Sequence, residues 1–241
     1  MPKRKTQFIN NEIYHIILRS VGDTPIFIDE SDHFRAVFSI YEFNNSKKVD
    51  IRRRRKQRKT EKKLENNDNG RSVVIVPVRD MYVEILVFAI MSNHIHLLVR
   101  QLKENGISNF MQKFGGLAWY FNKKYSRKGH LFCTFHSVHI ASNEQLRNVF
   151  IYIHCNPISL IESDWKENRI KKPRKTIEFL NNYKWSSYRD YIDIQNFSSV
   201  TKRNFLQEFL GGANSCKNLV EEWIKYKSRN CKFDFDEVDI E

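Results

Sequence analysis

The sequence has little of what marks a membrane, secreted or disulfide-bonded protein. No apolar run approaches the roughly 20 residues that span a bilayer. The basic start of the chain, Met1 to Phe8, has no apolar stretch beside it, so we expect no signal peptide. The four cysteines include no Cys-x-x-Cys pair, which favours reduced thiols. We therefore expect a cytoplasmic protein without a membrane partner.

Acidic residues are in short supply relative to basic ones. The chain has 41 Lys and Arg against 28 Asp and Glu, a net charge of +13. Eleven basic and only two acidic residues lie between Asn45 and Lys63, so this stretch alone carries +9. A phosphate backbone is the natural partner of such a cluster, because neutralising it releases counterions. The alternative is a solvated insertion, over about residues 45–72, without a specific role.

Apolar residues make up 41% of the chain and aromatic residues 13%, enough for a core. Apolar patterning predicts a mixture of strands and helices. The expected strands are residues 12–19, 82–90, 94–100 and 135–140, and the expected helices are residues 32–43, 108–125 and 143–156. Ser31 and Ser142 are the expected N-caps of the first and third helices. The short turn at residues 91–93 makes its two strands antiparallel neighbours, so we predict an α+β fold.

The most informative motif is His94-Ile-His96, within Met91-Ser-Asn-His-Ile-His-Leu-Leu-Val-Arg100. Residues two apart on a strand point the same way, so both imidazoles leave one face of the sheet. Imidazole is a common ligand of divalent metal ions, and the pair suggests half of a metal site. The alternative is an ordinary pair of strand histidines that bond to their neighbours or face water.

A second set of candidates lies on the helix expected over residues 143–156. Tyr152 and Asn156 are four residues apart and share one helix face. An asparagine oxygen can bind a divalent cation, and a tyrosine can act as a covalent nucleophile. The alternative is a buried tyrosine and a helix-ending asparagine before proline. His136 and His139 are further candidates, and the sequence identifies no general base.

Four motifs, taken in order, resemble the REP-associated tyrosine transposases, a group of single-tyrosine HUH transposases of the IS200-like type. They are Met91-Ser-Asn-His-Ile-His-Leu-Leu-Val99, Tyr120-Phe-Asn122 with Gly129-His-Leu-Phe132, Tyr152-Ile-His-Cys-Asn-Pro157, and Trp185-Ser-Ser-Tyr188. The resemblance covers about residues 8–191. It implies a ferredoxin-like antiparallel sheet flanked by helices, with the basic insertion and a helical C-terminal extension outside the pattern. The expected division is a transposase domain at residues 1–191 and an extension at residues 192–241.

The resemblance also implies the chemistry. His94 and His96 would bind Mg²⁺ or Mn²⁺ with Asn156 as a third ligand, and Tyr152 would be the nucleophile. Such an enzyme cleaves and rejoins single-stranded DNA near hairpins through a 5′-phosphotyrosine intermediate. Tyr120 and Tyr125 are rivals of Tyr152 by residue type only.

Some alternatives stay open at this point. The other function that fits the charge and the aromatic content is a non-catalytic DNA- or RNA-binding regulator with the same fold. Exposed aromatic side chains stack on unpaired bases in proteins of either kind, and the candidates are Trp119, Tyr120, Trp185 and Tyr188. The sequence is compatible with a monomer and with a homodimer.

Overall fold

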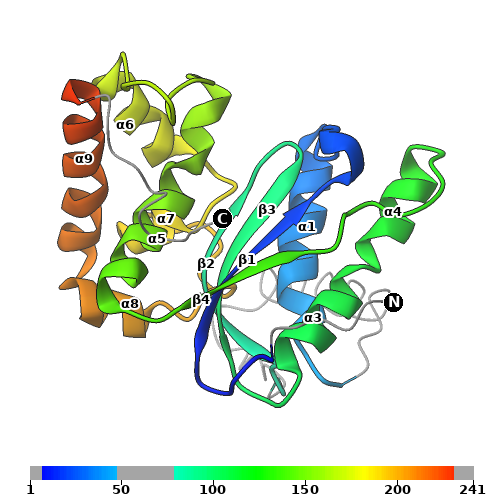
Figure 1. Cartoon of the computed structure of the whole chain (residues 1–241). Helices are drawn as coiled ribbons and strands as arrows, with labels where there is room; N and C mark the ends of the chain where they lie inside the picture. Colours follow the sequence, from blue (N-terminus) through cyan, green and yellow to red (C-terminus); the bar gives the residue numbers. More distant parts are fainter. Residues whose placement is uncertain (1–6, 48–78, 231–241) are drawn as a thin grey trace, which may run out of the picture.

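The computed structural model describes residues 7–47 and 79–230 of the chain (Figure 1). Most of the basic insertion, and the acidic end of the chain, lie outside these ranges. The helices and strands of the described residues are β1 (Ile13–Arg19), η1 (Val21–Asp23), α1 (Glu30–Phe43), β2 (Val83–Ile90), β3 (His94–Gln101), α3 (Gly106–Phe114), α4 (Leu117–Lys124), β4 (His136–Ile140), α5 (Asn143–Cys155), η2 (Asn156–Leu160), α6 (Pro173–Asn182), α7 (Tyr188–Tyr191), α8 (Asn204–Leu210) and α9 (Ala213–Arg229).

The strands form one four-stranded sheet in the order β2-β3-β1-β4. Every neighbouring pair is antiparallel. Along the chain, η1 and α1 lie between β1 and β2, a tight turn joins β2 to β3, and α3 and α4 precede β4. This is the βαββαβ connectivity of ferredoxin-like folds. The predicted α+β class and the predicted ferredoxin-like sheet are confirmed.

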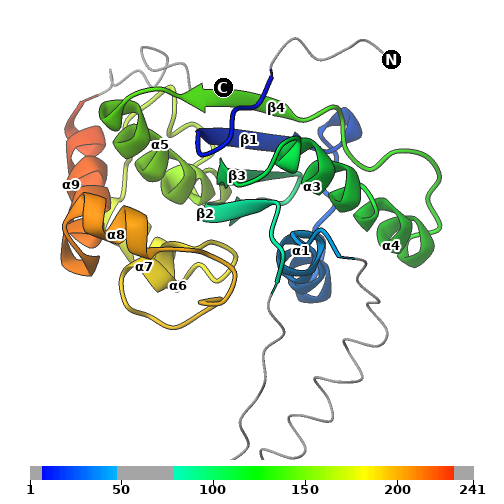
Figure 2. The same ribbon diagram turned by 90° about the horizontal axis from the view of Figure 1, so that it is seen from below.

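The sheet is covered on both faces, as Figures 1 and 2 show. On β3, Ile95 and Leu97 pack into a core shared with α1, α3 and α4. Leu98 packs into the opposite core, which is shared with α5 and the helices that follow it. Because strand side chains alternate between faces, His94 and His96 leave the sheet on the side of α5.

The ends of the helices follow capping chemistry, with two corrections to the sequence expectation. Asp29, rather than Ser31, caps α1: its carboxylate accepts a hydrogen bond from the Asp32 backbone N–H, and the Asp32 carboxylate accepts one from the Asp29 backbone N–H. The helix expected over residues 108–125 is two helices, α3 and α4, broken at Gly115 and Gly116, since glycine weakens a helix interior. Ser142 caps α5, as predicted.

The outer edge of β2 is closed by residues that follow α6. The Trp185 carbonyl accepts a hydrogen bond from the Ile90 backbone (2.9 Å), and the Ser187 backbone donates to the Phe88 carbonyl (3.0 Å). The Tyr183 hydroxyl donates to the Ile90 carbonyl at 2.6 Å. These contacts satisfy edge groups that an open strand would leave unpaired. The Trp-Ser-Ser-Tyr motif thus has a structural role at the sheet edge.

The C-terminal helices extend the layer formed by α5. Helix α9 contacts both α5 and α6, and it lies on the side of α5 away from the sheet (Figure 1). Val220 and Ile224 of α9 are fully buried in the same core as Phe150 of α5. None of the helices in the described ranges combines the length and apolar character needed to cross a bilayer.

Candidate metal and nucleophile site

The two histidines of the His-x-His motif start β3 and lie side by side. Their ring centroids are 4.8 Å apart. His96 is fully buried, whereas His94 is partly exposed. The rigid central strand therefore holds both imidazoles toward α5, with one of them at the surface.

Helix α5 crosses the sheet on this face and brings the other two candidates to the histidines. The His94 Nε2 atom lies 3.4 Å from the Asn156 Oδ1 atom. The ring of Tyr152 lies edge-on to the ring of His96, with centroids 5.6 Å apart. The two helix residues contact this region together because they are one helical turn apart. The structure thus places all four sequence candidates in one cluster.

A third histidine, His15 on β1, joins the cluster. Its Nε2 atom lies 3.0 Å from the His96 Nδ1 atom, and both rings are fully buried. The other nitrogen of His96, Nε2, is buried and has no hydrogen-bond partner among the described residues. Burial holds the pKa of His96 well below its ordinary value, and the nearby His94 and His15 lower that pKa further. A neutral imidazole is the form that binds metal ions.

A lysine completes the surroundings of Tyr152. The Lys166 Nζ atom donates a hydrogen bond to the Tyr152 hydroxyl oxygen at 2.7 Å. The same ammonium group lies 4.8 Å from the centre of the tyrosine ring. Tyr152 itself is 2% exposed. The phenol oxygen therefore lies beside a positive charge in a largely buried position.

Sequence reasoning missed both His15 and Lys166. His15 lies in one of the predicted strands. The register that pairs it with Leu98, two residues from His96, cannot be read from local sequence patterns. Lys166 is one of 41 basic residues and belongs to no motif. Lys166 differs from the other basic residues only because the chain after η2 brings it to Tyr152.

The rival tyrosines lie away from the cluster. The Tyr125 hydroxyl donates to an Asp32 carboxylate oxygen at 2.6 Å, and the ring of Tyr120 contacts the Arg35 guanidinium at 5.0 Å. Both tyrosines belong to the core that includes α1, α3 and α4, on the opposite face of the sheet from α5. Neither can approach His96 without crossing the sheet.

The remaining histidine candidates have other positions. The His139 ring lies 2.9 Å from a Glu12 carboxylate oxygen at the surface. His136 is exposed on β4. His154, although close in sequence to Tyr152, points elsewhere, with its Nε2 atom 2.9 Å from the Ser187 hydroxyl. Burial lowers the pKa of His154 to about 3, so this ring is neutral.

The candidates for base stacking differ in exposure. Trp119 is 64% exposed, with the Lys123 ammonium 5.3 Å from its ring centre. Trp185 stacks on His33 at 4.7 Å between centroids. Tyr188 is 1% exposed, so the expectation that it stacks on a base is wrong: its ring fills the core beside α5. Trp119 is the candidate most open to a ligand.

The donor atoms of His94, His96 and Asn156 suit a divalent cation. No group of three or more His, Cys, Asp or Glu side chains in residues 7–47 and 79–230 is arranged for a metal, so the candidate set depends on the asparagine. Adjacent ligands of an octahedral ion are about 3 Å apart when each lies about 2.1 Å from the metal. The 3.4 Å between His94 Nε2 and Asn156 Oδ1 is close to that separation. The unpartnered, buried His96 Nε2 supplies a further free donor.

Comparison with known proteins bears on this cluster. Residues 44–156 match the family model described as "Transposase IS200 like", in agreement with the IS200-like resemblance of the motifs within that range. The solved structure of a REP-associated tyrosine transposase bound to a REP hairpin is similar with a TM-score of 0.44 and 10% sequence identity, over 82% of this chain and 90% of that chain. No curated protein matches the chain.

Proposed function

We propose that this chain, which resembles the IS200-like transposases, is a metal-dependent transposase that cleaves and rejoins single-stranded DNA. The observation that carries the proposal is the cluster around Tyr152. The Lys166 ammonium donates to the Tyr152 oxygen, the Tyr152 ring lies edge-on to the His96 imidazole, and the His94 imidazole lies beside the Asn156 amide, which together suit a metal ion. The residues that would carry the chemistry all lie within residues 1–191, and we treat residues 192–241 as an extension.

In this proposal, His94, His96 and Asn156 hold Mg²⁺ or Mn²⁺. The bound ion would withdraw charge from the scissile phosphate and orient it for in-line attack. Two imidazoles with one amide oxygen form a mixed nitrogen and oxygen donor set, and Mn²⁺ accepts such a set more readily than Mg²⁺. His15 supports the set, because its Nε2 can accept the hydrogen of His96 Nδ1 and leave His96 Nε2 free for the metal.

Tyr152 supplies the nucleophile. Its phenol oxygen attacks phosphorus and forms an O–P bond, while the bond from phosphorus to the 3′-oxygen of the preceding nucleotide breaks. The products are a 5′-phosphotyrosine and a free 3′-OH. A phenol has a reference pKa near 10 and must lose its proton in this step. Because the phosphodiester is retained as a covalent link, a DNA 3′-OH can attack it in turn and join strands.

The substrate we propose is single-stranded DNA beside a hairpin. An unpaired strand lets a single phosphate enter the cluster and leaves bases free to stack. Trp119 offers an exposed ring for such stacking. The eleven basic residues between Asn45 and Lys63 would contact the backbone electrostatically.

A specific observation keeps the non-catalytic alternative in view. Tyr152 is 2% exposed, and a phosphate has to reach its oxygen before any reaction occurs. A regulator that binds DNA or RNA without turnover needs no such access. The two functions differ in one measurable product, a covalent link between protein and DNA.

The test is an adduct assay. Labelled single-stranded hairpin DNA is incubated with the full chain and Mg²⁺ or Mn²⁺, and the covalent product is separated under denaturing conditions. We expect an adduct that is absent in Tyr152→Phe and strongly reduced in His96→Ala. Tyr120→Phe is the matched control and should retain the adduct. An adduct that persists in Tyr152→Phe would rule out this nucleophile, and binding without an adduct in the parent chain would favour the regulator.

A further inference from the structure

A lysine that belongs to none of the recognised motifs contacts the proposed reacting atom. The Lys166 Nζ atom donates to the Tyr152 hydroxyl oxygen at 2.7 Å. Lys166 lies in the segment between η2 and α6, outside the helix that bears the tyrosine. We infer that Lys166 is a catalytic residue, which stabilises negative charge on the Tyr152 oxygen as that oxygen attacks and, in rejoining, leaves. The inference rests on the proposed function.

Strand transfer needs a positive group beside the tyrosine oxygen in two steps, cleavage and rejoining. In cleavage, the phenol gives its proton to solvent as the O–P bond forms, and the 3′-oxygen takes a proton from solvent when its bond to phosphorus breaks. In rejoining, the O–P bond to Tyr152 breaks and the phenol oxygen leaves with the electron pair. An ammonium within hydrogen-bond distance stabilises the phenolate-like oxygen in both directions. Lys166 keeps its own protons throughout, so its contribution is electrostatic.

The backbone around Lys166 is fixed by the C-terminal helix. Trp165 is fully buried and packs edge-on against Trp223 of α9, with ring centroids 5.6 Å apart. Lys227 of α9 is 1% exposed, and its ammonium donates to the Lys166 backbone carbonyl at 2.9 Å. An aromatic contact and a charged hydrogen bond from one helix therefore hold the lysine in place.

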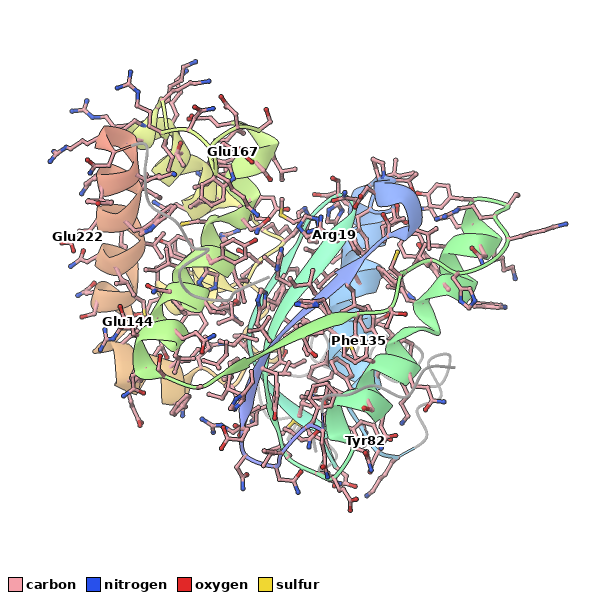
Figure 3. All side chains as sticks on the ribbon, in the orientation of Figure 1. Arg19, Tyr82, Phe135, Glu144, Glu167 and Glu222 are labelled. Carbon is pink, nitrogen blue, oxygen red and sulfur yellow. The ribbon has the colours of Figure 1, made fainter. Side chains whose placement is uncertain are left out.

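Through these contacts the C-terminal extension helps to position Lys166. The neighbouring residue Glu167 is labelled in Figure 3 on the helical side of the molecule, and Arg19, at the end of β1, is labelled on the sheet side. Helix α9 reaches the cluster through Trp165 and Lys166. Trp223 and Lys227 are thus positioning residues for the site, and an extension outside the family pattern completes it.

The first test separates chemistry from binding. Single-turnover adduct formation on hairpin DNA with Mn²⁺ is measured for the parent chain, Lys166→Ala and Lys166→Arg, together with DNA affinity and melting temperature. We expect Lys166→Ala to slow adduct formation about 100-fold, the loss typical of one missing charge-stabilising donor, with affinity changed less than threefold. Lys166→Arg should retain most of the rate. Added ethylammonium should restore part of the rate to Lys166→Ala, which a merely structural lysine would not allow.

The outcomes are distinguishable. If the parent forms the adduct and Lys166→Ala forms it at the same rate, Lys166 has no catalytic role and the proposed function stands. A rate loss matched by an equal loss of affinity, without rescue by ethylammonium, also overturns the inference. If the parent forms no adduct, the proposed function itself fails and the inference fails with it.

The second test concerns α9. Lys227→Met removes the hydrogen bond to the Lys166 carbonyl but keeps the length of the buried stem. We expect adduct formation to slow severalfold while DNA affinity is retained. Lys225→Met is the matched control, because Lys225 is exposed and pairs only weakly with Glu221 at 3.8 Å. Equal rates in the two variants would show that α9 does not position Lys166.

Discussion

The Ser187 hydroxyl joins the helix of the proposed nucleophile to the edge of the sheet. Its oxygen accepts a hydrogen bond from the Phe88 backbone at 3.0 Å and lies 2.9 Å from the His154 Nε2 atom. Ser187 and His154 are fully buried, and Phe88 is fully buried on the outer strand of the sheet. We predict that Ser187→Ala destabilises the protein far more than the loss of one surface hydroxyl.

The magnitude follows from the two partners that the substitution leaves behind. A buried donor or acceptor without a partner costs about 1–3 kcal/mol. The substitution leaves two such groups, the Phe88 N–H and the His154 Nε2 atom. Because local adjustment relieves part of the cost, we expect the free energy of unfolding to fall by about 3 kcal/mol. For a chain of this size, 1 kcal/mol corresponds to about 2–4 °C, so the melting temperature should fall by about 6–12 °C.

The assay is urea denaturation followed by circular dichroism, with thermal melting as a second probe. Ser228→Ala is the control, since its hydroxyl donates to the Lys225 carbonyl on an exposed face of α9. It should change the free energy of unfolding by less than about 0.5 kcal/mol. If Ser187→Ala were as stable as Ser228→Ala, the claim that buried partners depend on this hydroxyl would be refuted.

Three further predictions concern the surface and the thiols. The hydrogen bond from Lys124 holds the pKa of Asp29 below its ordinary 3.8 in the folded protein. As pH falls, the Asp29 carboxylate is therefore protonated in the unfolded chain before it is protonated in the folded one. The resulting stability is present above about pH 4 and lost below it. Asp29→Asn, which retains the cap, should flatten this acid dependence in urea midpoints measured from pH 7 to pH 2. A thiol reagent at pH 8 should modify exposed Cys133 in the folded protein, whereas mass mapping should find Cys155, whose pKa is raised by burial, modified only after denaturation. Trp119→Ala should weaken single-stranded DNA binding by about 1–3 kcal/mol in a filter-binding assay, with an unchanged melting temperature, if its exposed ring stacks on a base.

The local features of this protein could be predicted from its sequence. Strand alternation places His94 and His96 on the same face of the sheet. Helical spacing places Tyr152 and Asn156 on the same face of their helix. The cap at Ser142 and the antiparallel hairpin also follow from short-range geometry. Each of these depends on backbone periods of a few residues, which a sequence carries directly.

Near-neighbour choices between similar residues were less predictable. Asp29 and Ser31 are both good N-caps. Asp29 takes this position because it forms reciprocal hydrogen bonds with Asp32. The break at Gly115 and Gly116 turned one expected helix into two, because glycine weakens a helix interior. Small differences in free energy decided both cases.

The sequence by itself determined the four strands, the helix that bears Tyr152 and the pairs of side chains that these elements present. Only the tertiary structure decided how those pairs meet. His15 reaches His96 across 81 residues of chain, and Lys166 reaches Tyr152 from a different segment that α9 fixes in place. Strand register and helix packing set such contacts, and these depend on the whole core rather than on any local pattern of residues.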